Sequence, residues 1–562
     1  MNTVFILILI AAFVVFLYVA GKIREKQKKK AFRQKLIDDL GKLPELNYTQ
    51  ADFDRIRKFH DLKSEEAPDQ DRFRVDEITW NDLNMNDVFL LFDATLSSAG
   101  EEYLYHKMHT MDLAEDPGFT DLTDAFYRED DFRLQMQMIL GELSKIRHFS
   151  VAEVLFRIRD VESEKNLRHI IADLCLLASI GLIFVRPGIG VLLLIVCLSY
   201  NVFTYYRRKG EISPYYTTLF YVIRMLHAAD EIHKNGKIPK QDQERLRSVL
   251  SDCRSYKRNI FILGNGVMLS ESIMDILLEY IRIIFHLDII KFNSMLHFLQ
   301  KDLDKILTLF EMLGKYDAAI AVALSMHAMK GLNRPEFIEE KTVMIEDVFH
   351  PLIKEPVANS ITASSGVLIT GSNASGKSTF IKSVALCALL SQTLYVVPAR
   401  SYRACRFRLM TSMALNDQIL SGESYFIVEI KSLKRIVDLA DTNGAPVLCV
   451  VDEVLRGTNT IERIAASARI LYGLEQKNAL CFVATHDIEL TKILKKSYTD
   501  YHFEEEIADG DVNFSYVLKE GRSNTHNAIR LLSVIGFDEN VIEEATKAAE
   551  HFRQTNKWEM IE

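Results

Sequence analysis

The sequence has no excess of basic residues, and this absence limits what it can bind by composition alone. Its 562 residues include 68 lysines and arginines against 77 aspartates and glutamates, so the formal net charge is −9. A protein whose main task is to grip a phosphate backbone is usually basic or carries a concentrated basic stripe. Apart from the cluster that follows the N-terminal apolar run, the chain has no long stripe of this kind. Composition therefore gives no support to a dedicated nucleic-acid-binding protein.

Paired cysteines and internal repeats are also missing. The seven cysteines form no Cys-x-x-Cys pair, and most of them lie in apolar runs. This pattern predicts buried, reduced thiols rather than a disulfide framework. No repeat or low-complexity tract is present, and the length leaves room for several domains with a sizeable core.

The most informative motif that is present is a phosphate-binding loop. Residues 371–379 fit the pattern G-x-x-x-x-G-K-[ST] at every fixed position, between an apolar run (366–370) that predicts a strand and a following helix. A strand, a glycine-rich turn and a helix direct backbone N–H groups and a positive helix end at one spot, which suits a polyphosphate. Lys377 would reach the outer phosphates and the Ser378 hydroxyl would ligate Mg²⁺. The predicted nucleotide-binding residues are Gly371, Ser372, Asn373, Ala374, Ser375, Gly376, Lys377, Ser378 and Thr379.

Two further strands end in residues that suit the same chemistry. The apolar run 447–451 is followed by Asp452 and Glu453. Asp452 lies where a metal-directed carboxylate belongs, and Glu453 where a general base for the attacking water belongs. A third apolar run, 479–485, ends at His486, which could hydrogen-bond a terminal phosphate. Acids after a strand are often only a solvated loop, and it is the phosphate loop upstream that favours the catalytic interpretation.

Four segments in this order resemble the ATPase domain of the MutS family of mismatch-repair proteins. They are residues 368–379, Ser421-Gly-Glu-Ser-Tyr-Phe-Ile-Val-Glu429, residues 451–460 and Ala484-Thr-His-Asp-Ile-Glu-Leu490. The resemblance covers about residues 334–550. It implies an α/β P-loop NTPase domain of the ABC/MutS type, preceded by an all-α lever or core domain, here with transmembrane helices. It also implies an enzyme that binds and hydrolyses ATP with Mg²⁺.

The family's residue roles pass to the positions that match. Asn373 would contact the terminal phosphate, and His486 would sense it. Ser424 would act in trans and complete the nucleotide site of a second subunit, so the resemblance implies a homodimer. Together with the motifs, it assigns Glu453, His486 and Lys377 to catalysis and Ser378 and Asp452 to the metal ion.

The chain departs from the family pattern near the nucleotide. Val357 stands where a phenylalanine usually stacks on adenine, which leaves the choice between adenine and guanine open. Leu455 stands where a glycine is usual, and Asn459 where a serine is usual. The Asp-Gly that commonly follows is replaced by Ile461-Glu-Arg463. These changes lie near the expected dimer contact.

Two apolar regions predict a membrane protein. Residues 4–20 are uninterrupted apolar sequence followed by a basic cluster, which predicts an uncleaved anchor with the rest of the chain in the cytoplasm. Residues 170–206 form a second apolar region that Arg186-Pro-Gly188 divides into two arms with basic residues at both ends. We expect three crossings in the cytoplasmic membrane. The alternative for the second region is a buried helical hairpin in a soluble core, because each arm is short.

These observations predict four segments. They are a transmembrane anchor (1–21), a basic juxtamembrane segment and linker (22–75), a helical MutS-like core or lever domain with the hairpin at 170–206 (76–333), and a MutS-type ATPase domain (334–562). Residues 268–286 and 295–313 show the helical spacing expected of lever helices. The family's mismatch-reading domain and DNA clamp have no recognisable counterpart. We therefore expect a shortened, membrane-anchored member.

Two functions remain open from sequence. The first is a membrane-anchored MutS-like ATPase that binds mismatched or structured DNA in DNA repair, as the resemblance implies. The second is a membrane-bound, ATP-driven conformational switch that acts on a protein partner without binding DNA. Acidic net charge and the missing clamp favour the second function, whereas the family resemblance favours the first.

Overall fold

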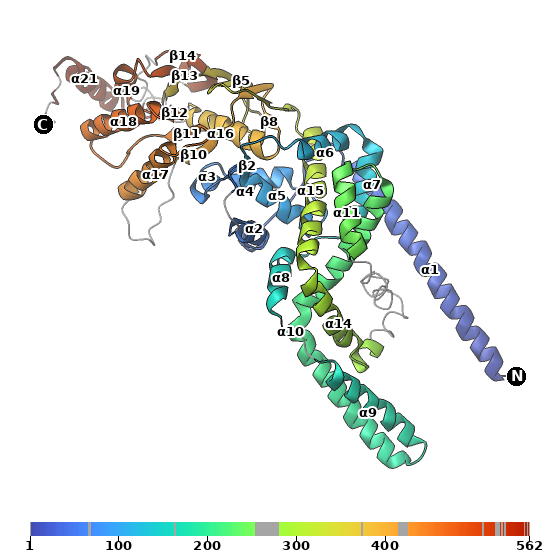
Figure 1. Ribbon diagram of the computed structural model, residues 1–562. Coiled ribbons are helices and arrows are strands. Elements are labelled where there is room, and N and C mark those ends of the chain that lie inside the picture. The colour runs from blue at the N-terminus through green and yellow to red at the C-terminus, as the bar shows by residue number, and fades with distance from the viewer. Residues whose placement is uncertain are drawn as a thin grey trace. The chain divides into compact units, whose positions relative to one another are not determined.

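The computed structural model describes residues 2–65, 69–161, 165–252, 280–372, 375–413, 425–508, 511–522 and 536–555, with single residues 529, 532, 557, 558 and 560. Internal contacts divide the chain into two units (Figure 1). The helical unit comprises Met1–Ala67, Leu91–His106 and Pro117–Ala328. The sheet unit comprises Pro68–Leu90, Lys107–Asp116 and Met329–Glu562.

The helical unit contains α-helices and one short 3₁₀ turn. Its elements are α1 (Asn2–Asp38), α2 (Gln50–Ser64), α5 (Ser98–Met108), α6 (Pro117–Arg128), α7 (Asp130–Gly141), α8 (Val151–Arg157), η1 (Ile158–Asp160), α9 (Leu167–Ile183), α10 (Pro187–Asn235), α11 (Lys240–Asp252), α14 (Leu287–Lys301) and α15 (Leu303–Ala328). The predicted lever run 295–313 is confirmed as helix, with a break between α14 and α15. Most of the predicted run 268–286 lies outside the described residues.

The central helix of this unit is α15, which is buried along most of its length. Its Asp317 is buried and its carboxylate accepts hydrogen bonds from the backbone N–H groups of Leu96 (3.1 Å) and Ser97 (2.8 Å). One turn earlier, Gly314 lies so close to α5 that an added Cβ would stand 2.6 Å from the carbonyl oxygen of Ala99 and 2.7 Å from Cβ of Tyr103. The helices therefore pack at a distance that only glycine permits at position 314.

The predicted apolar hairpin is present as α9 and the first half of α10, which pack against each other around a turn at residues 184–186 (Figure 1). Among the described residues, one segment is long and apolar enough to cross a bilayer, Pro187–Gly210 of α10. The other arm, α9, has 17 residues. The prediction of several transmembrane helices is thus reduced to one candidate by length and hydropathy. The predicted anchor, residues 1–21, falls in α1, and most of its side chains lie outside the described part.

The sheet unit contains a six-stranded sheet in the order β10-β11-β12-β7-β13-β14. These strands are β7 (Gly366–Thr370), β10 (Arg408–Ser412), β11 (Val447–Asp452), β12 (Ala479–Ala484), β13 (Tyr498–Ala508) and β14 (Asp511–Glu520). All neighbours pair in parallel except β13 and β14, which form an antiparallel hairpin. The described helices in the C-terminal segment of this unit, from Met329 onward, are α16 (Lys377–Thr393), α17 (Tyr425–Ala440), α18 (Thr460–Glu475), α19 (Ile488–Ile493) and α21 (Glu539–Thr555).

A second, four-stranded sheet has the order β4-β9-β5-β6. Its strands are β4 (Glu336–Phe337), β5 (Val343–Val348), β6 (Asn359–Ala363) and β9 (Ser401–Ala404), and a separate short pair joins β3 (Leu332–Asn333) to β8 (Val397–Pro398). The three strands predicted around the site are confirmed as β7, β11 and β12, in which every residue is buried. Continuous apolar runs are typical of parallel strands that are covered on both faces.

The division into units differs from the predicted boundaries in one respect. The division at residues 328 and 329 lies close to the predicted start of the ATPase domain at 334. However, residues 76–90 and 107–116, which the prediction placed in the helical domain, pack with the sheet unit. They form α3 (Glu77–Asp82), most of α4 (Met85–Phe92) and β2 (Thr110–Asp112), and β1 (Arg72–Arg74), from the predicted linker, belongs to the same unit. Long-range packing of this kind leaves no local signal in the sequence.

The close contact at Gly314 predicts a cost for any side chain there. Gly314→Ala should lower the free energy of unfolding by roughly 1–3 kcal/mol, because the added methyl group overlaps α5. Gly473→Ala is the matched control, since Gly473 lies in α18 and an added Cβ there meets nothing within 4 Å. The control should be neutral or stabilising by up to about 1 kcal/mol, as expected for glycine to alanine in a helix. Urea unfolding of both full-length variants measures the difference, and equal stabilities would contradict the packing.

Candidate functional site

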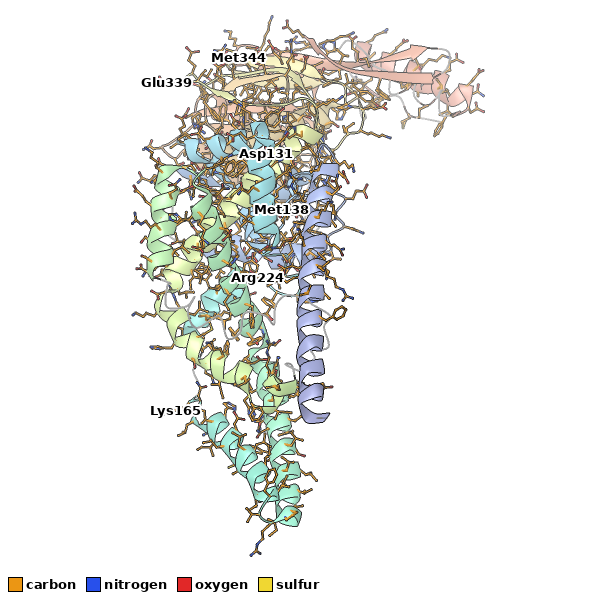
Figure 2. The ribbon with its side chains drawn as sticks, turned by 90° about the vertical axis from the view of Figure 1, so that its right-hand side faces the viewer. Asp131, Met138, Lys165, Arg224, Glu339 and Met344 are labelled. Carbon is orange, nitrogen blue, oxygen red and sulfur yellow. The ribbon has the colours of Figure 1, made fainter. Side chains whose placement is uncertain are left out.

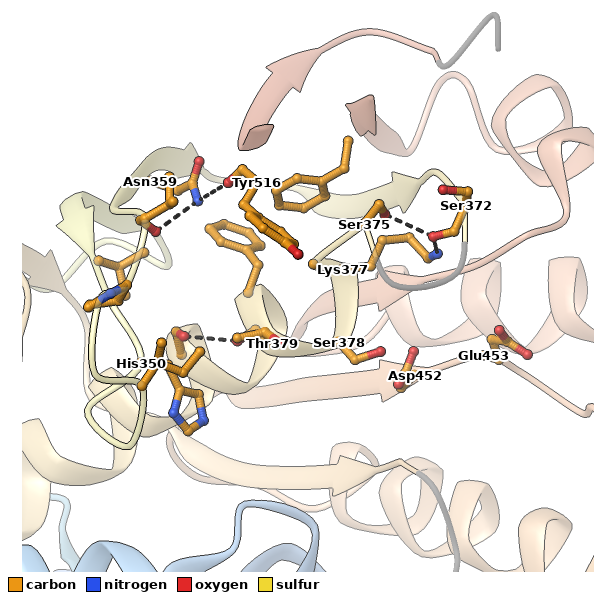
Figure 3. Close-up of a pocket in the computed structure, with 18 of the residues that line it drawn as sticks. His350, Asn359, Ser372, Ser375, Lys377, Ser378, Thr379, Asp452, Glu453 and Tyr516 are labelled. Atoms are coloured by element: carbon orange, nitrogen blue, oxygen red, sulfur yellow. Dashed lines mark hydrogen bonds between the residues drawn. The ribbon is translucent and has the colours of Figure 1, made fainter. Parts of the chain in front are cut away.

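All the predicted site residues that the structure describes, except Gly371, line one cavity of about 800 Å³ in the sheet unit (Figure 3). The phosphate loop, the end of β11 and the segment that follows β12 all contribute to it. The predicted residues that line it are Ser372, Ser375, Gly376, Lys377, Ser378, Thr379, Asp452, Glu453 and His486. Parallel pairing brings them together, because β7, β12 and β11 are adjacent and their carboxyl ends meet at one edge of the sheet.

The loop conformation requires glycine at two of its positions. Gly371 and Gly376 have φ angles of 145° and 106°, which side-chain-bearing residues rarely adopt. A Cβ at Gly371 would also stand 2.8 Å from the carbonyl oxygen of Phe503 on β13. Glycine is therefore required at both positions. It leads directly into the N-terminus of α16, whose first N–H groups have no intrahelical partner and can bind an anion.

Lys377 is buried at the start of α16, and its ammonium group bonds to the loop itself. Its Nζ donates to the carbonyl oxygens of Gly371 (2.8 Å) and Ser372 (2.6 Å). A buried ammonium group needs such acceptors, since an isolated charge is costly away from water. The same contacts hold the side chain across the loop, where it can transfer to phosphate oxygens as the sequence predicted.

Ser378 and Asp452 supply the oxygen atoms that a magnesium ion prefers. Figure 3 shows the Ser378 side chain directed towards Asp452, which is buried at the end of β11. Mg²⁺ is commonly held by one or two protein oxygens together with substrate phosphates. The described residues contain no cluster of three or more His, Cys, Asp or Glu side chains that could bind a metal without such help. This donor set fits a magnesium ion that arrives with a nucleotide.

Glu453 is held from two sides. Its Oε1 lies 2.9 Å from Nε2 of His486, and its Oε2 lies 2.7 Å from Nε of Arg456. Its backbone has a φ of 60°, and its N–H donates to the carbonyl oxygen of Ala484 on β12 (2.8 Å). The turn after β11 therefore aims the carboxylate into the cavity and fixes it there. The sequence predicted Glu453 and His486 in this place but gave no sign of Arg456.

These partners set the charge state of the carboxyl group. The hydrogen bond from His486 lowers the pKa of Glu453 below its usual value, and the positive charges of Arg456 and Lys377 act in the same direction against the effect of burial. Glu453 thus remains a carboxylate at neutral pH. In that form it accepts a hydrogen bond from a water molecule rather than donating one.

Aromatic and apolar side chains form the rest of the cavity wall. Val357 lines it as predicted, but most of the flat surface comes from Phe380, Phe503 and Tyr516. Tyr516 is fixed by Asn359, whose side chain donates to the Tyr516 carbonyl oxygen (2.9 Å) and accepts from the N–H of Leu518 (2.7 Å). The sequence analysis did not find Tyr516, since its strand, β14, is brought to the cavity by the hairpin with β13.

His350 also lines the cavity, and it is neutral. Burial lowers the pKa of its imidazole to about 4, and the nearby charge of Lys382 adds to the effect. A neutral imidazole offers one donor and one acceptor and a flat ring. The Phe349-His-Pro351 segment marks the entry to this part of the chain in the sequence, but the sequence gave no role for the histidine.

The departures near the second motif have clear structural outcomes. Asn459 is the N-cap of α18, because its side chain accepts from the N–H groups of Ile461 (3.0 Å) and Glu462 (3.1 Å). Asparagine and serine are comparable caps, so this exchange costs little. Leu455 is buried in the core with a φ of 59°, a strained conformation for a residue with a side chain. Arg463 binds both carboxylate oxygens of Asp487, at 2.6 and 2.9 Å.

Three predicted site residues fall outside the described part of the chain. They are Asn373 and Ala374 in the loop and Ser424 in the predicted signature segment. Their roles remain predictions.

The phosphate loop follows the central parallel strand β7, and the acidic pair lies at the carboxyl end of β11 in the same sheet. This arrangement defines a P-loop nucleotide-binding domain. Comparisons with known proteins agree with this class. Residues 367–553 match the family model for MutS domain V. The DNA mismatch repair protein MutS of Aquifex pyrophilus is 32% identical over 258 residues, which are 44% of this chain and 30% of that protein.

Two other relatives give similar values. The MutS of Persephonella marina is 30% identical over 263 residues, covering 45% of this chain and 30% of the relative. The DNA mismatch repair protein MutS 2 of Haloarcula marismortui is 34% identical over 180 residues, covering 31% and 19%. The matched part spans less than a third of the length of these relatives. The chain therefore contains a region that is similar to domain V of MutS proteins.

The geometry predicts separate effects for Lys377 and Glu453. Lys377→Ala should abolish nucleotide binding, because it removes the cation that reaches the phosphates. Glu453→Gln should leave binding intact and slow hydrolysis by roughly 10²–10⁴-fold, the usual contribution of a positioned base. Fluorescent-nucleotide binding and phosphate release measure the two effects, with the exposed Glu489→Gln as the matched control. A Glu453→Gln variant that hydrolyses ATP at the wild-type rate would contradict the assignment.

Proposed function

We propose that this protein is a Mg²⁺-dependent ATPase that hydrolyses ATP at a site shared between two copies of the chain. One observation carries the proposal: the phosphate loop, the Ser378–Asp452 oxygens and the Glu453–His486 pair line a single cavity. ATP is the proposed nucleotide because the matched family domain and the relatives are named MutS, and MutS proteins are ATPases. Ser424 of a second subunit is proposed to complete the site.

In this proposal each residue has one task. The loop N–H groups and Lys377 bind the phosphates, and Tyr516 with Phe503 offers a flat surface for the base. Ser378 and Asp452 hold the magnesium ion, which neutralises phosphate charge when it is bound. Glu453 accepts a hydrogen bond from the attacking water and orients it. His486 keeps the carboxylate in place and lies where it can reach a terminal phosphate.

Phosphoryl transfer depends mainly on positioning and on electrostatic stabilisation. The restraint of Glu453 by His486 and Arg456 suits this demand, since the carboxylate does not have to search for its orientation. The same restraint leaves both carboxylate oxygens engaged before any water binds. Each oxygen still has a lone pair that can accept a hydrogen bond from the attacking water.

DNA is the proposed ligand of the active dimer, because the relatives are named as DNA mismatch repair proteins. A protein partner is the second candidate, and the net charge of −9 favours it. The two candidates predict different responses of the same enzyme. Binding to a phosphate backbone releases counterions and therefore weakens steeply as salt rises.

The deciding experiment measures the ATPase rate of the full-length protein with homoduplex, mismatched and branched DNA over a salt series. Stimulation that falls steeply with salt is the expected result for a DNA-dependent ATPase. Intact basal hydrolysis with no response to any DNA would refute DNA as the ligand and favour the protein-partner function. The Lys377→Ala variant, which should not bind nucleotide, measures the background rate of phosphate release with each DNA and at each salt concentration.

We further propose that the protein is held in the cytoplasmic membrane, with the ATPase part in the cytoplasm, and that the α9–α10 hairpin enters the bilayer. Large apolar side chains are exposed along both helices, and those of the turn, Phe184 and Val185, are 86% and 76% exposed. Basic residues lie at the base of the hairpin, including Lys165, which Figure 2 labels, and Arg207. Apolar flanks with basic residues at the base are typical of helices that span a membrane from the cytoplasm.

The acidic residue within the hairpin, Asp173, has polar partners. Asp173 is buried, and one of its oxygens lies 3.0 Å from Nδ1 of His286 and accepts from the side chain of Asn201 (3.3 Å). A lone charge on a membrane helix is costly, so such partners are expected on the inward face. The anchor at residues 1–21 is part of the same proposal.

Cysteine labelling tests the orientation of the hairpin. Phe184→Cys should react with an impermeant maleimide in right-side-out membrane vesicles, because the turn would reach the outer face. Gln241→Cys, at an exposed position in α11, is the matched control and should react only in inside-out vesicles. Reaction of Phe184→Cys only in inside-out vesicles, or recovery of the protein without membranes, would refute the insertion.

A further inference from the structure

Helix α3 lies along an open edge of the six-stranded sheet, although it comes from the N-terminal part of the chain. β10 is the edge strand and pairs with β11 on one side only. On its other side, Thr411 donates its backbone N–H to Oγ1 of Thr79 (3.2 Å), and Met413 donates its own to Oδ2 of Asp82 (3.0 Å). An unpaired strand edge needs partners for such groups. Here side chains of α3 provide them.

Of these two side chains, Asp82 accepts more hydrogen bonds from the end of β10. Its Oδ2 also accepts from Oγ1 of Thr411 (2.6 Å), so one oxygen holds two donors at the end of β10. Asp82 is 8% exposed, and burial raises the pKa of its carboxyl group despite these hydrogen bonds. A neutral residue would fill this place at lower cost if packing were its only purpose. The retained acid therefore suggests a role in holding the strand end.

The other end of α3 binds the next helix of the sheet unit. Asp76 is the N-cap of α3 and accepts from the N–H of Thr79 (2.8 Å), and its second oxygen forms an ion pair with Arg435 of α17. Arg435 also donates to the carbonyl oxygen of Thr411. Asp76, Arg435 and the end of β10 are thus joined directly.

From α17 the contacts continue to the catalytic turn. Glu429 of α17 is buried, and its Oε1 accepts from the backbone N–H of Arg456 (2.9 Å). Arg456 in turn holds the carboxylate of Glu453 at 2.7 Å. A continuous set of contacts therefore leads from α3 through α17 to the proposed catalytic carboxylate, and all of it lies within the sheet unit.

We propose that α3 is a positioning element for ATP hydrolysis, in which Asp76 and Asp82 hold α17 and the end of β10 and thereby hold Arg456 against Glu453. The proposal rests on the ATPase function proposed above. The chain also connects α3 to the helical unit. Helix α4 comes next after α3, and the last two residues of α4, Leu91 and Phe92, belong to that unit.

The test uses Asp76→Asn, which removes the charge but keeps a good N-cap, so α3 itself should remain intact. We expect kcat for ATP to fall about tenfold or more, which corresponds to about 1.4 kcal/mol of transition-state stabilisation, with KM and nucleotide affinity within about threefold of wild type. Arg435→Gln should give the same loss. The double variant should be no slower than Arg435→Gln alone, because the Arg435 variant already removes the ion pair with Asp76.

Asp82 provides an independent pair of variants. Asp82→Ala should lower kcat in the same way, whereas Asp82→Asn keeps an oxygen that can accept both hydrogen bonds and should recover most of the rate. Asp87→Asn, an exposed acid on α4, is the matched control and should be unchanged.

Each outcome decides a different claim. Variants that hydrolyse ATP like the wild type would overturn the positioning role and leave the ATPase proposal standing. Variants that lose nucleotide affinity and also melt at a lower temperature would overturn it too, since α3 would then only support the fold. A wild-type protein that binds no ATP and hydrolyses none would overturn both proposals.

Discussion

The parallel pairing of β7, β12 and β11 is the constraint on which the site depends. In the sequence, the acidic pair lies some 80 residues after the start of the phosphate loop, and the histidine some 110 residues after it. Each of them nevertheless lies at the carboxyl end of one of these three adjacent strands. Apart from Thr370 and Asp452 at their ends, the strands are apolar, and every residue in them is buried, so their order and register are fixed by the core. Polar residues at the strand ends are consequently placed by residues that take no part in the chemistry.

A second group of contacts fixes orientation rather than position. Glu453 is held by His486 and Arg456, Arg456 by Glu429, and the loop after β12 by the double contact between Arg463 and Asp487. The replacements around the second motif fit this arrangement, because Asn459 caps α18 and Leu455 fills the core from a strained backbone. The strain at Glu453 and Leu455 is retained where the surroundings determine the turn, as is common at functional sites.

Sequence was sufficient where the signal is local. The loop, its flanking strand and helix, the acids after β11 and the histidine after β12 were all predicted at the residues where they occur, because glycine-rich turns and apolar strands have short-range patterns. Tyr516, Arg456 and α3 were not found. Tyr516 reaches the cavity through a hairpin, Arg456 acts through an ion pair, and α3 packs against a strand some 330 residues away. The expectation of three membrane crossings relied on hydropathy, and among the described residues only Pro187–Gly210 meets the length and hydropathy of a span.

The central claim is that this cavity binds one magnesium nucleotide per chain. Isothermal titration calorimetry of the full-length protein with a non-hydrolysable ATP analogue tests it most directly, in the presence of magnesium and again with the metal removed by a chelator. One nucleotide should bind per chain, and binding should be clearly weaker without magnesium, since Ser378 and Asp452 would bind the nucleotide through the ion. An absence of binding under both conditions, or binding that is indifferent to magnesium, would contradict it.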